Sequence, residues 1–206
     1  MVREMPYTTE KFTEIWRGKD GREALSVSIE YPALTLHSTP ARKINAYYAR
    51  RNRQFTEICK KILPRRTADI SGLPVKAILT TQITYIDAKR VSLLNAVDFN
   101  GAARARICAD LWSLESGTPL PYTALFPETR NPKGHILKLV RSEIRRQSER
   151  GFHTFYPGAL KRMRSAFAAR NIFLNSGGEA VILFPRGTIA PDVCEFVVKQ
   201  SPEPPE

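Results

Sequence analysis

The stretch from Val75 to Leu114, VKAILTTQITYIDAKRVSLLNAVDFNGAARARICADLWSL, decides the fold of this chain. Apolar side chains fall on alternate positions in three segments of this stretch, which is the period of a strand with one buried face. The segments are Val75–Tyr85, Val91–Phe99 and Ala105–Leu111. Asn100-Gly101 separates the last two, and both of its residues accept the positive φ of a type I′ hairpin turn. The stretch therefore predicts an antiparallel meander.

Shorter strand patterns lie on both sides of the meander. Before it, the turn Gly18-Lys19-Asp20-Gly21 joins two alternating segments into an expected β-hairpin, and Pro32 should end the second strand because it lacks an N–H group. After it, the Asn175-Ser176-Gly177-Gly178 turn joins segments 172–174 and 181–184, and a last strand is expected at 195–198.

Three helices are expected between these strands. Ser38-Thr39-Pro40 supplies a hydroxyl cap and a first-turn proline, and Pro64 should stop this helix. Its buried stripe recurs in steps of three and four residues and includes Ile44, Tyr48, Phe55 and Ile58. A second helix should run from Asn131-Pro132 to Gly151, and a short third one lies around residues 160–167. The pattern predicts an α+β fold in which an antiparallel β-meander and hairpins carry two longer helices and one short helix.

The length of 206 residues suits a single domain over residues 1–200, and any subdivision would fall near residue 70 or residue 130. The Pro-rich, acidic tail 201–206 is expected to be disordered. The sequence shows no apolar run typical of a leader or a membrane span. The expected compartment is thus the cytoplasm for the chain as written, or the outside of the cell for a trimmed precursor.

The net charge of +12 favours an anionic partner such as nucleic acid, an acidic envelope polymer or an anionic lipid surface. The exposed sides of the two longer predicted helices are basic. They carry Arg42, Lys43, Arg50, Arg53, Lys60 and Lys61 on the first helix, and Lys138, Arg141, Arg145, Arg146 and Arg150 on the second. A merely solvated basic surface explains the same pattern, so nucleic-acid binding through these helices stands as an alternative function.

No residue spacing marks a catalytic or metal centre. The histidines His37, His135 and His153 are far apart in sequence, and the three cysteines form no CxxC pair. The motifs of serine hydrolases, phosphate-loop enzymes and dinucleotide-binding enzymes are missing. The carboxylates nearest the strand ends are Asp87, Asp98, Asp110 and Asp192, and nothing in the sequence brings two of them together. We therefore expect no enzyme activity, catalytic residue, metal or cofactor.

Three pieces of the chain carry a family resemblance, in the family's order. They are Ile29 to Leu34 followed by Lys43-Ile44-Asn45, Asp110 to Phe126, and Phe184 to Phe196 with Ile189-Ala190-Pro191. These pieces resemble the extracytoplasmic domain of the RsiV-type anti-sigma factors, which is shared with the N-terminal part of PdaC-type peptidoglycan deacetylases. The resemblance implies an α+β fold and a non-enzymatic role in binding at the cell envelope.

The family's known ligand class, for its anti-sigma members, is lysozyme. Two departures bear on that ligand. Asn100-Gly101-Ala102-Ala103 stands where members often carry a Gly-Gly-Ala-His-like loop, and a chain of net charge +12 would repel a basic lysozyme.

Loops at the strand ends combine this resemblance with local basic charge. The candidate binding residues are Asn100, Arg104, Arg106, Tyr122 and Arg186. The expected function is a non-enzymatic binding or sensor-like domain whose partner is an unknown protein or an anionic envelope polymer. Arg104 and Arg106 also fit the solvent face of a strand, which leaves a purely structural interpretation open. The oligomeric state does not follow from the sequence.

Overall fold

The structure is a computed structural model, and it describes residues 6–67, 75–99, 106–151 and 154–200. The expected Asn100-Gly101 turn and the acidic tail 201–206 lie outside these residues.

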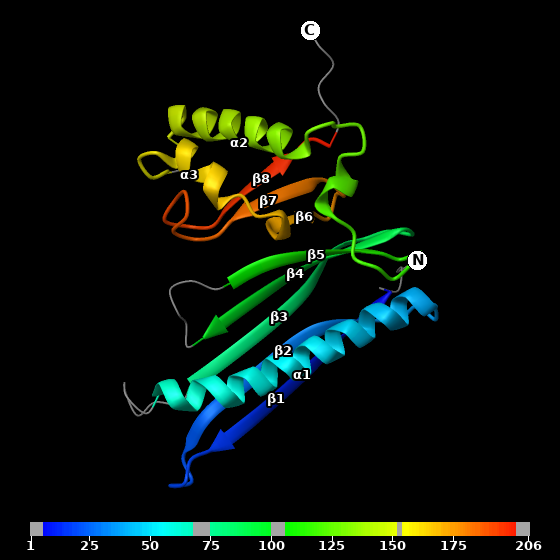
Figure 1. Cartoon of the computed structure of the whole chain (residues 1–206), viewed down its shortest axis with the longest axis vertical. Helices are drawn as coiled ribbons and strands as arrows, with labels where there is room; N and C mark the ends of the chain where they lie inside the picture. The colour runs from blue at the N-terminus through cyan, green and yellow to red at the C-terminus, as the bar shows by residue number, and fades with distance from the viewer. Residues whose placement is uncertain (1–5, 68–74, 100–105, 152–153, 201–206) are drawn as a thin grey trace.

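A five-stranded sheet forms one half of the molecule (Figure 1). Its strands are β1 (Tyr7–Arg17), β2 (Glu23–Leu34), β3 (Val75–Ile86), β4 (Arg90–Phe99) and β5 (Arg106–Ser113), in the order β1-β2-β3-β4-β5. The hairpin β1–β2 and the meander β3–β4–β5 are antiparallel, which confirms both predictions. The parallel pairing of β2 with β3 was not predicted from the sequence. It arises because helix α1 (Thr39–Thr67) connects these strands as a crossover.

Strand β2 runs past Pro32, where it was expected to end. Its pairing with β3 stops at Glu30, so the nitrogen of Pro32 faces no third strand and its missing N–H costs no ladder bond. Beyond the last residue of β2 that pairs with β3, the side chain of Asn45 in α1 bonds to the backbone of the strand. This side chain donates to the carbonyl of Leu34 and accepts from the N–H of Leu34, both at 2.9 Å.

Helix α1 begins as expected, because the hydroxyl oxygen of Ser38 accepts a hydrogen bond from the N–H of Ala41 at 3.3 Å. Its end differs from the expectation, since the helix continues past Pro64 to Thr67. The helix packs on one face of the five-stranded sheet, where it buries Leu25, Ile29 and other core residues of β2 and β3.

The meander was expected to turn one apolar face inward, but both faces of β5 are covered. Cys108, Asp110 and Trp112 alternate with Ile107, Ala109 and Leu111. Trp112 packs in the core beneath α1, whereas Ala109 and Leu111 belong to cores shared with a second sheet. This strand therefore joins the two halves of the protein.

The second sheet consists of three short antiparallel strands in the order β6-β7-β8. They are β6 (Ile172–Leu174), β7 (Ala180–Phe184) and β8 (Cys194–Val198). The helices beside it are α2 (Pro132–Glu149) and the short α3 (Ala159–Ala166), with the 3-10 turns η1 (Tyr122–Leu125) and η2 (Ala169–Asn171) nearby. Asn131 caps α2 as predicted, because its side-chain oxygen accepts from the N–H of Gly134 at 3.0 Å.

The two sheets meet where β6 lies against β4 and β5. The N–H of Leu174 donates to the hydroxyl of Ser92 at 3.0 Å, and Phe173 packs in the same core as Ala109. Figure 1 shows α1 along the larger sheet at one end of the elongated molecule and α2 over the smaller sheet at the other. The expected α+β fold with two longer helices and one short helix is confirmed. No helix in the described part of the chain is long and apolar enough to cross a membrane.

Candidate functional site

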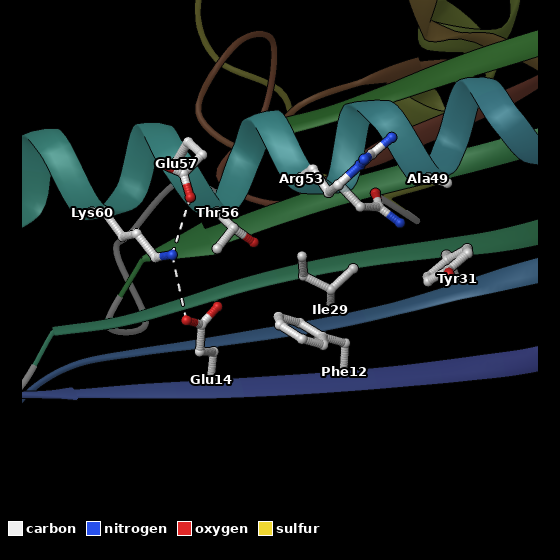
Figure 2. Close-up of a pocket in the computed structure, with 10 residues that line it drawn as sticks. Phe12, Glu14, Ile29, Tyr31, Ala49, Arg53, Thr56, Glu57 and Lys60 are labelled. Carbon is white, nitrogen blue, oxygen red and sulfur yellow. Dashed lines mark hydrogen bonds and ion pairs between the residues drawn. The ribbon is translucent and has the colours of Figure 1, made fainter.

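A groove of about 450 Å³ lies between α1 and the hairpin β1–β2 (Figure 2). The hairpin contributes Phe12, Glu14, Ile29 and Tyr31, and the helix contributes Ala49, Asn52, Arg53, Thr56, Glu57 and Lys60. The helical residues recur in steps of three and four, so they share one side of α1. Phe12 and Glu14 are alternate residues of β1 and point to the same face of the sheet. The groove therefore lies between one side of α1, defined by the helical period, and one face of the hairpin, defined by the alternation of residues along a strand.

Lys60 fastens the helix to β1 at one end of the groove. Its ammonium nitrogen lies 3.0 Å from a carboxylate oxygen of Glu57 and 3.4 Å from one of Glu14, and it stands 4.7 Å above the centre of the Trp16 ring. The hydrogen bond with Glu57, together with that to Glu14, raises the pKa of Lys60 above its ordinary value. Lys60 therefore stays charged in the neutral range, and Figure 2 shows it spanning the space between the helix and the strand.

Asn52 is the most unusual residue of the groove. Only 6% of its surface is exposed, yet neither its side-chain oxygen nor its side-chain nitrogen has a hydrogen-bond partner among the described residues. A buried polar group without a partner costs about 1–3 kcal/mol of stability. The carboxamide can accept two hydrogen bonds and donate two, so it is complementary to a group that both donates and accepts.

The groove around Asn52 is lined by apolar side chains and by charged side chains of both signs, Glu14 and Glu57 as well as Arg53 and Lys60. Phe12 is 44% exposed although it lines the groove, and Ile29 is buried beside it. Arg53 is exposed at the groove, and no ion pair or hydrogen bond with another described residue engages it. The groove therefore offers an apolar wall, an unsatisfied amide and a free cation within one concavity.

A second polar cluster under α1 has the opposite character, because nearly all of its groups are paired. Arg51 donates to Asn95 and to Thr81, each at 2.6 Å. Asp110 accepts from the hydroxyl of Tyr48 at 2.8 Å and from the amide of Asn95 at 2.9 Å. Burial, with Asp110 next in effect, raises the pKa of Tyr48, so its hydroxyl stays protonated and donates. We infer that this cluster has a structural role and holds α1 against β3, β4 and β5.

Three of the four carboxylates considered in the sequence have separate partners, whereas one side-chain oxygen of Asp98 is buried without a hydrogen-bond partner among the described residues. Asp87 bonds to Arg90 within the β3–β4 turn, Asp110 lies in the cluster under α1, and Asp192 is 3.9 Å from Arg186. Among the described residues, no three histidine, cysteine, aspartate or glutamate side chains are grouped as metal ligands.

The residues proposed from the sequence lie on different parts of the surface. Arg106 is the exposed first residue of β5, and Tyr122 lies in η1 with its ring 5.9 Å from that of Phe167. Arg186 is exposed in the β7–β8 loop and donates to the carbonyl of Pro191 at 3.2 Å. Asn100 and Arg104 lie outside the described residues.

The structure does not bring Arg106 and Tyr122 together. Leu120 donates to the carbonyl of Leu111 at 2.7 Å, which places the segment before Tyr122 beside the far end of β5 from Arg106. At ~3.3 Å per residue, Arg106 and Leu111 are about 17 Å apart along the strand. Arg106 and Tyr122 therefore do not share a site, and the role of the five proposed residues in binding stays a prediction.

The basic sides of the two longer helices do not merge into one surface either. Helix α1 lies on the larger sheet and α2 on the smaller one, at opposite ends of the molecule in Figure 1. The two helices therefore cannot both bind the same segment of a nucleic-acid duplex.

Comparison with known proteins identifies the fold. No family model matches the chain, and no curated protein does. The solved structure of a DUF3298 family member from Bacteroides fragilis NCTC 9343 aligns with a TM-score of 0.64 at 12% identity, covering 94% of this chain and 89% of that one. A DUF3298 family protein from Pseudomonas aeruginosa PAO1 aligns with a TM-score of 0.56 at 10% identity, covering 95% of this chain and 92% of that one. The chain therefore shares the fold of these proteins.

Proposed function

We propose that this chain is a non-enzymatic binding domain that holds an amide-bearing ligand in the groove between α1 and β1. The observation that carries the proposal is Asn52, whose carboxamide is buried at the groove with both polar atoms unpaired. A group such as a peptide, a carboxamide or an acetamido substituent donates one hydrogen bond and accepts another, which matches both atoms at once. Binding such a group would recover the stability that the unpaired carboxamide costs.

The other walls of the groove define what should lie next to the amide. Phe12 and Ile29 suit an apolar substituent, and Arg53 suits a neighbouring anionic group. The net charge of +12 favours the same kind of ligand. The sequence resemblance to RsiV-type domains supports a ligand from the cell envelope, either a protein or an anionic polymer that contains amides.

The proposal is tested by titrating the isotope-labelled protein with two small amides, N-acetyl-leucinamide and N-acetylglucosamine, and following side-chain amide signals by NMR. We expect the NH₂ signals of Asn52 to shift in a saturable way with at least one of them. Asn45 is an internal control, because its amide is already bonded to Leu34. Its signals should stay in place.

The Asn52→Leu variant completes the test. It should lose the response of the groove residues to both amides while keeping the fold. If the Asn52 signals of the native protein do not move up to the solubility limit of either compound, the groove is not an amide site and the proposal is wrong.

A further inference from the structure

The first strand of the larger sheet has an open edge. Strand β1 pairs with β2, and no other strand in the described part of the chain pairs with its far side. The strand extends over Tyr7–Arg17 without a proline, and its register with β2 is regular as far as Trp16. Phe12 and Ile15 on this strand are 44% and 50% exposed. A long unpaired edge of this kind is a template on which a further strand can form.

The hydrogen bonds of the hairpin show which backbone groups of β1 point outward. The N–H of Thr35 donates to the carbonyl of Pro6 at 3.0 Å, and these residues lie one step beyond the opposed pair Tyr7 and Leu34. In an antiparallel pair, bonded residues alternate with residues whose N–H and C=O point away from the partner strand. The even-numbered residues of β1 therefore bond to β2. The outward-pointing residues are Tyr7, Thr9, Lys11, Thr13 and Ile15.

Two features of β2 agree with this assignment. Pro32 lies opposite Thr9 and has no N–H to donate, which fits a residue whose backbone points away from β1. Leu34 lies opposite Tyr7, and its N–H and C=O bond to Asn45 of α1. The outer edge of β1 therefore presents the backbone groups of its odd-numbered residues.

The charge of the hairpin differs from that of the whole protein. Residues 6–30 contain four cations and five anions, so their net charge is −1, whereas the whole chain carries +12. The cations are Lys11, Arg17, Lys19 and Arg22, and the anions are Glu10, Glu14, Asp20, Glu23 and Glu30. Two copies of this basic protein can therefore meet at β1 without bringing their positive surfaces into contact.

The sequence of β1 also restricts how two copies of the strand can pair. Outward-pointing residues must lie opposite each other, so the two-fold axis of an antiparallel pair of identical strands passes through a residue. An axis at Thr13 sets Phe12 of each copy opposite Glu14 of the other, and Lys11 opposite Ile15. An axis at Phe12 would set Glu10 opposite Glu14, and an axis at Glu10, Lys11 or Glu14 would set that charge opposite itself. Like charges directly opposite each other are destabilising, so the strand favours the axis at Thr13.

We infer that two copies of this chain pair through β1, antiparallel and with Thr13 on the two-fold axis, so that their larger sheets join into one continuous sheet. The axis is perpendicular to the sheet, which places α1 of both copies on the same face. The grooves at Asn52 therefore lie on one side of the dimer. This pairing is independent of the proposed amide ligand, because it uses only the edge of β1.

Sedimentation equilibrium of the native protein, Thr13→Pro and Thr13→Ala measures the association. Proline removes the outward N–H of Thr13, and an edge strand tolerates it because that N–H makes no bond to β2. Alanine removes the same side chain but keeps the N–H. We expect the native protein to dimerise with a dissociation constant below about 1 mM, Thr13→Pro to weaken association about tenfold or more, and Thr13→Ala to stay within about twofold.

A pair of cysteine variants tests the register. Thr13→Cys sets two thiols opposite each other across the axis, where the Cα atoms of bonded residues are about 5.5 Å apart, a separation that suits a disulfide. Thr9→Cys is the matched control on the same face of β1, because at ~3.3 Å per residue it lies about 26 Å from its copy. Oxidation should link Thr13→Cys into a dimer. It should leave Thr9→Cys and the native protein, with its free Cys59, Cys108 and Cys194, unlinked.

Each of these measurements can overturn the pairing. A native protein that stays monomeric at about 1 mM excludes the second copy and leaves the edge to a different partner. Association that Thr13→Pro leaves unchanged assigns the dimer to another surface. Equal cross-linking of Thr13→Cys and Thr9→Cys refutes the axis at Thr13. Urea unfolding shows whether each variant is folded, and the two cysteine variants decide the question if Thr13→Pro does not fold.

Discussion

Replacing Asn52 by leucine should make the protein more stable and at the same time unable to bind an amide-bearing ligand in the groove. The side chain is 94% buried, and the two atoms at its end have no partner among the described residues. Leucine places two methyl groups where the oxygen and nitrogen of asparagine stand. The surrounding groove, with about 450 Å³ of space, accepts the slightly larger side chain without forcing the helix away from β1.

The expected gain follows from the cost of the unpaired amide. Relieving a buried, unsatisfied polar group is worth about 1–3 kcal/mol. For a protein of this length, each 1 kcal/mol moves the thermal midpoint by about 2–4 °C, so we expect Asn52→Leu to raise it by about 2–12 °C. Such a gain is typical of a residue kept for binding at the expense of stability.

The assay is urea unfolding followed by circular dichroism, with thermal unfolding as a second measurement. Asn45→Leu is the matched control on the same helix, because Asn45 makes two bonds of 2.9 Å with the backbone of Leu34. This control should lose about 1–3 kcal/mol, since it leaves the N–H and C=O of Leu34 unpaired. If Asn52→Leu is destabilised to a similar extent, its amide has a structural role and the reasoning is refuted.

The remaining predictions concern the core, the titratable groups and the basic helices. Arg51→Met should destabilise the fold by at least about 2 kcal/mol in urea, because it leaves the partly buried Asp110 without its cation. Burial alone would raise the pKa of Asp87, but hydrogen bonds from the backbone of Lys89 and Arg90 and from the Arg90 side chain lower it below its ordinary value. Its stabilising effect is thus complete above the unfolded pKa, about 4, and disappears as the pH falls through the folded pKa. The urea midpoints of the native protein and Asp87→Asn should therefore differ at neutral pH and converge in acid. Burial raises the pKa of Cys59 to about 11, so its thiol should react with Ellman's reagent at neutral pH only after urea is added. Because the basic sides of α1 and α2 lie at opposite ends of the molecule, DNA-cellulose should release the protein at low salt, and retention above about 0.5 M salt would contradict this.

Sequence reasoning succeeded for most features whose determining interactions are local, although it placed the end of α1 at Pro64 and the helix continues to Thr67. The alternation in β3 and β4, the cap of α1 at Ser38 and the cap of α2 at Asn131 all depend on residues a few positions apart. It failed where two distant segments act on each other. Pro32 does not end β2, because whether its missing N–H matters depends on where β3 stops pairing.

The groove was missed for the same physical reason. Helical periodicity assigned Ile58 to the buried stripe of α1, yet this residue is 53% exposed, while Asn52 is 6% exposed. A polar residue four positions after Tyr48 and four before Thr56 was a usable signal, since all three share one side of the helix. The helical periodicity does not show whether the Asn52 amide is hydrogen-bonded, however, because its potential partners lie on β1 and β2.

The sequence by itself determined the strands, the helices and their caps, because these follow from steric preferences and hydrogen bonds within a few residues. Only the tertiary structure decided that α1 would cross over to make β2 and β3 parallel, that β1 would be left as an open edge, and that Asn52 would lie unpaired beside it. These features depend on which surface of α1 packs against which strands of the sheet. That packing is determined by the burial of apolar side chains from distant parts of the sequence in one core.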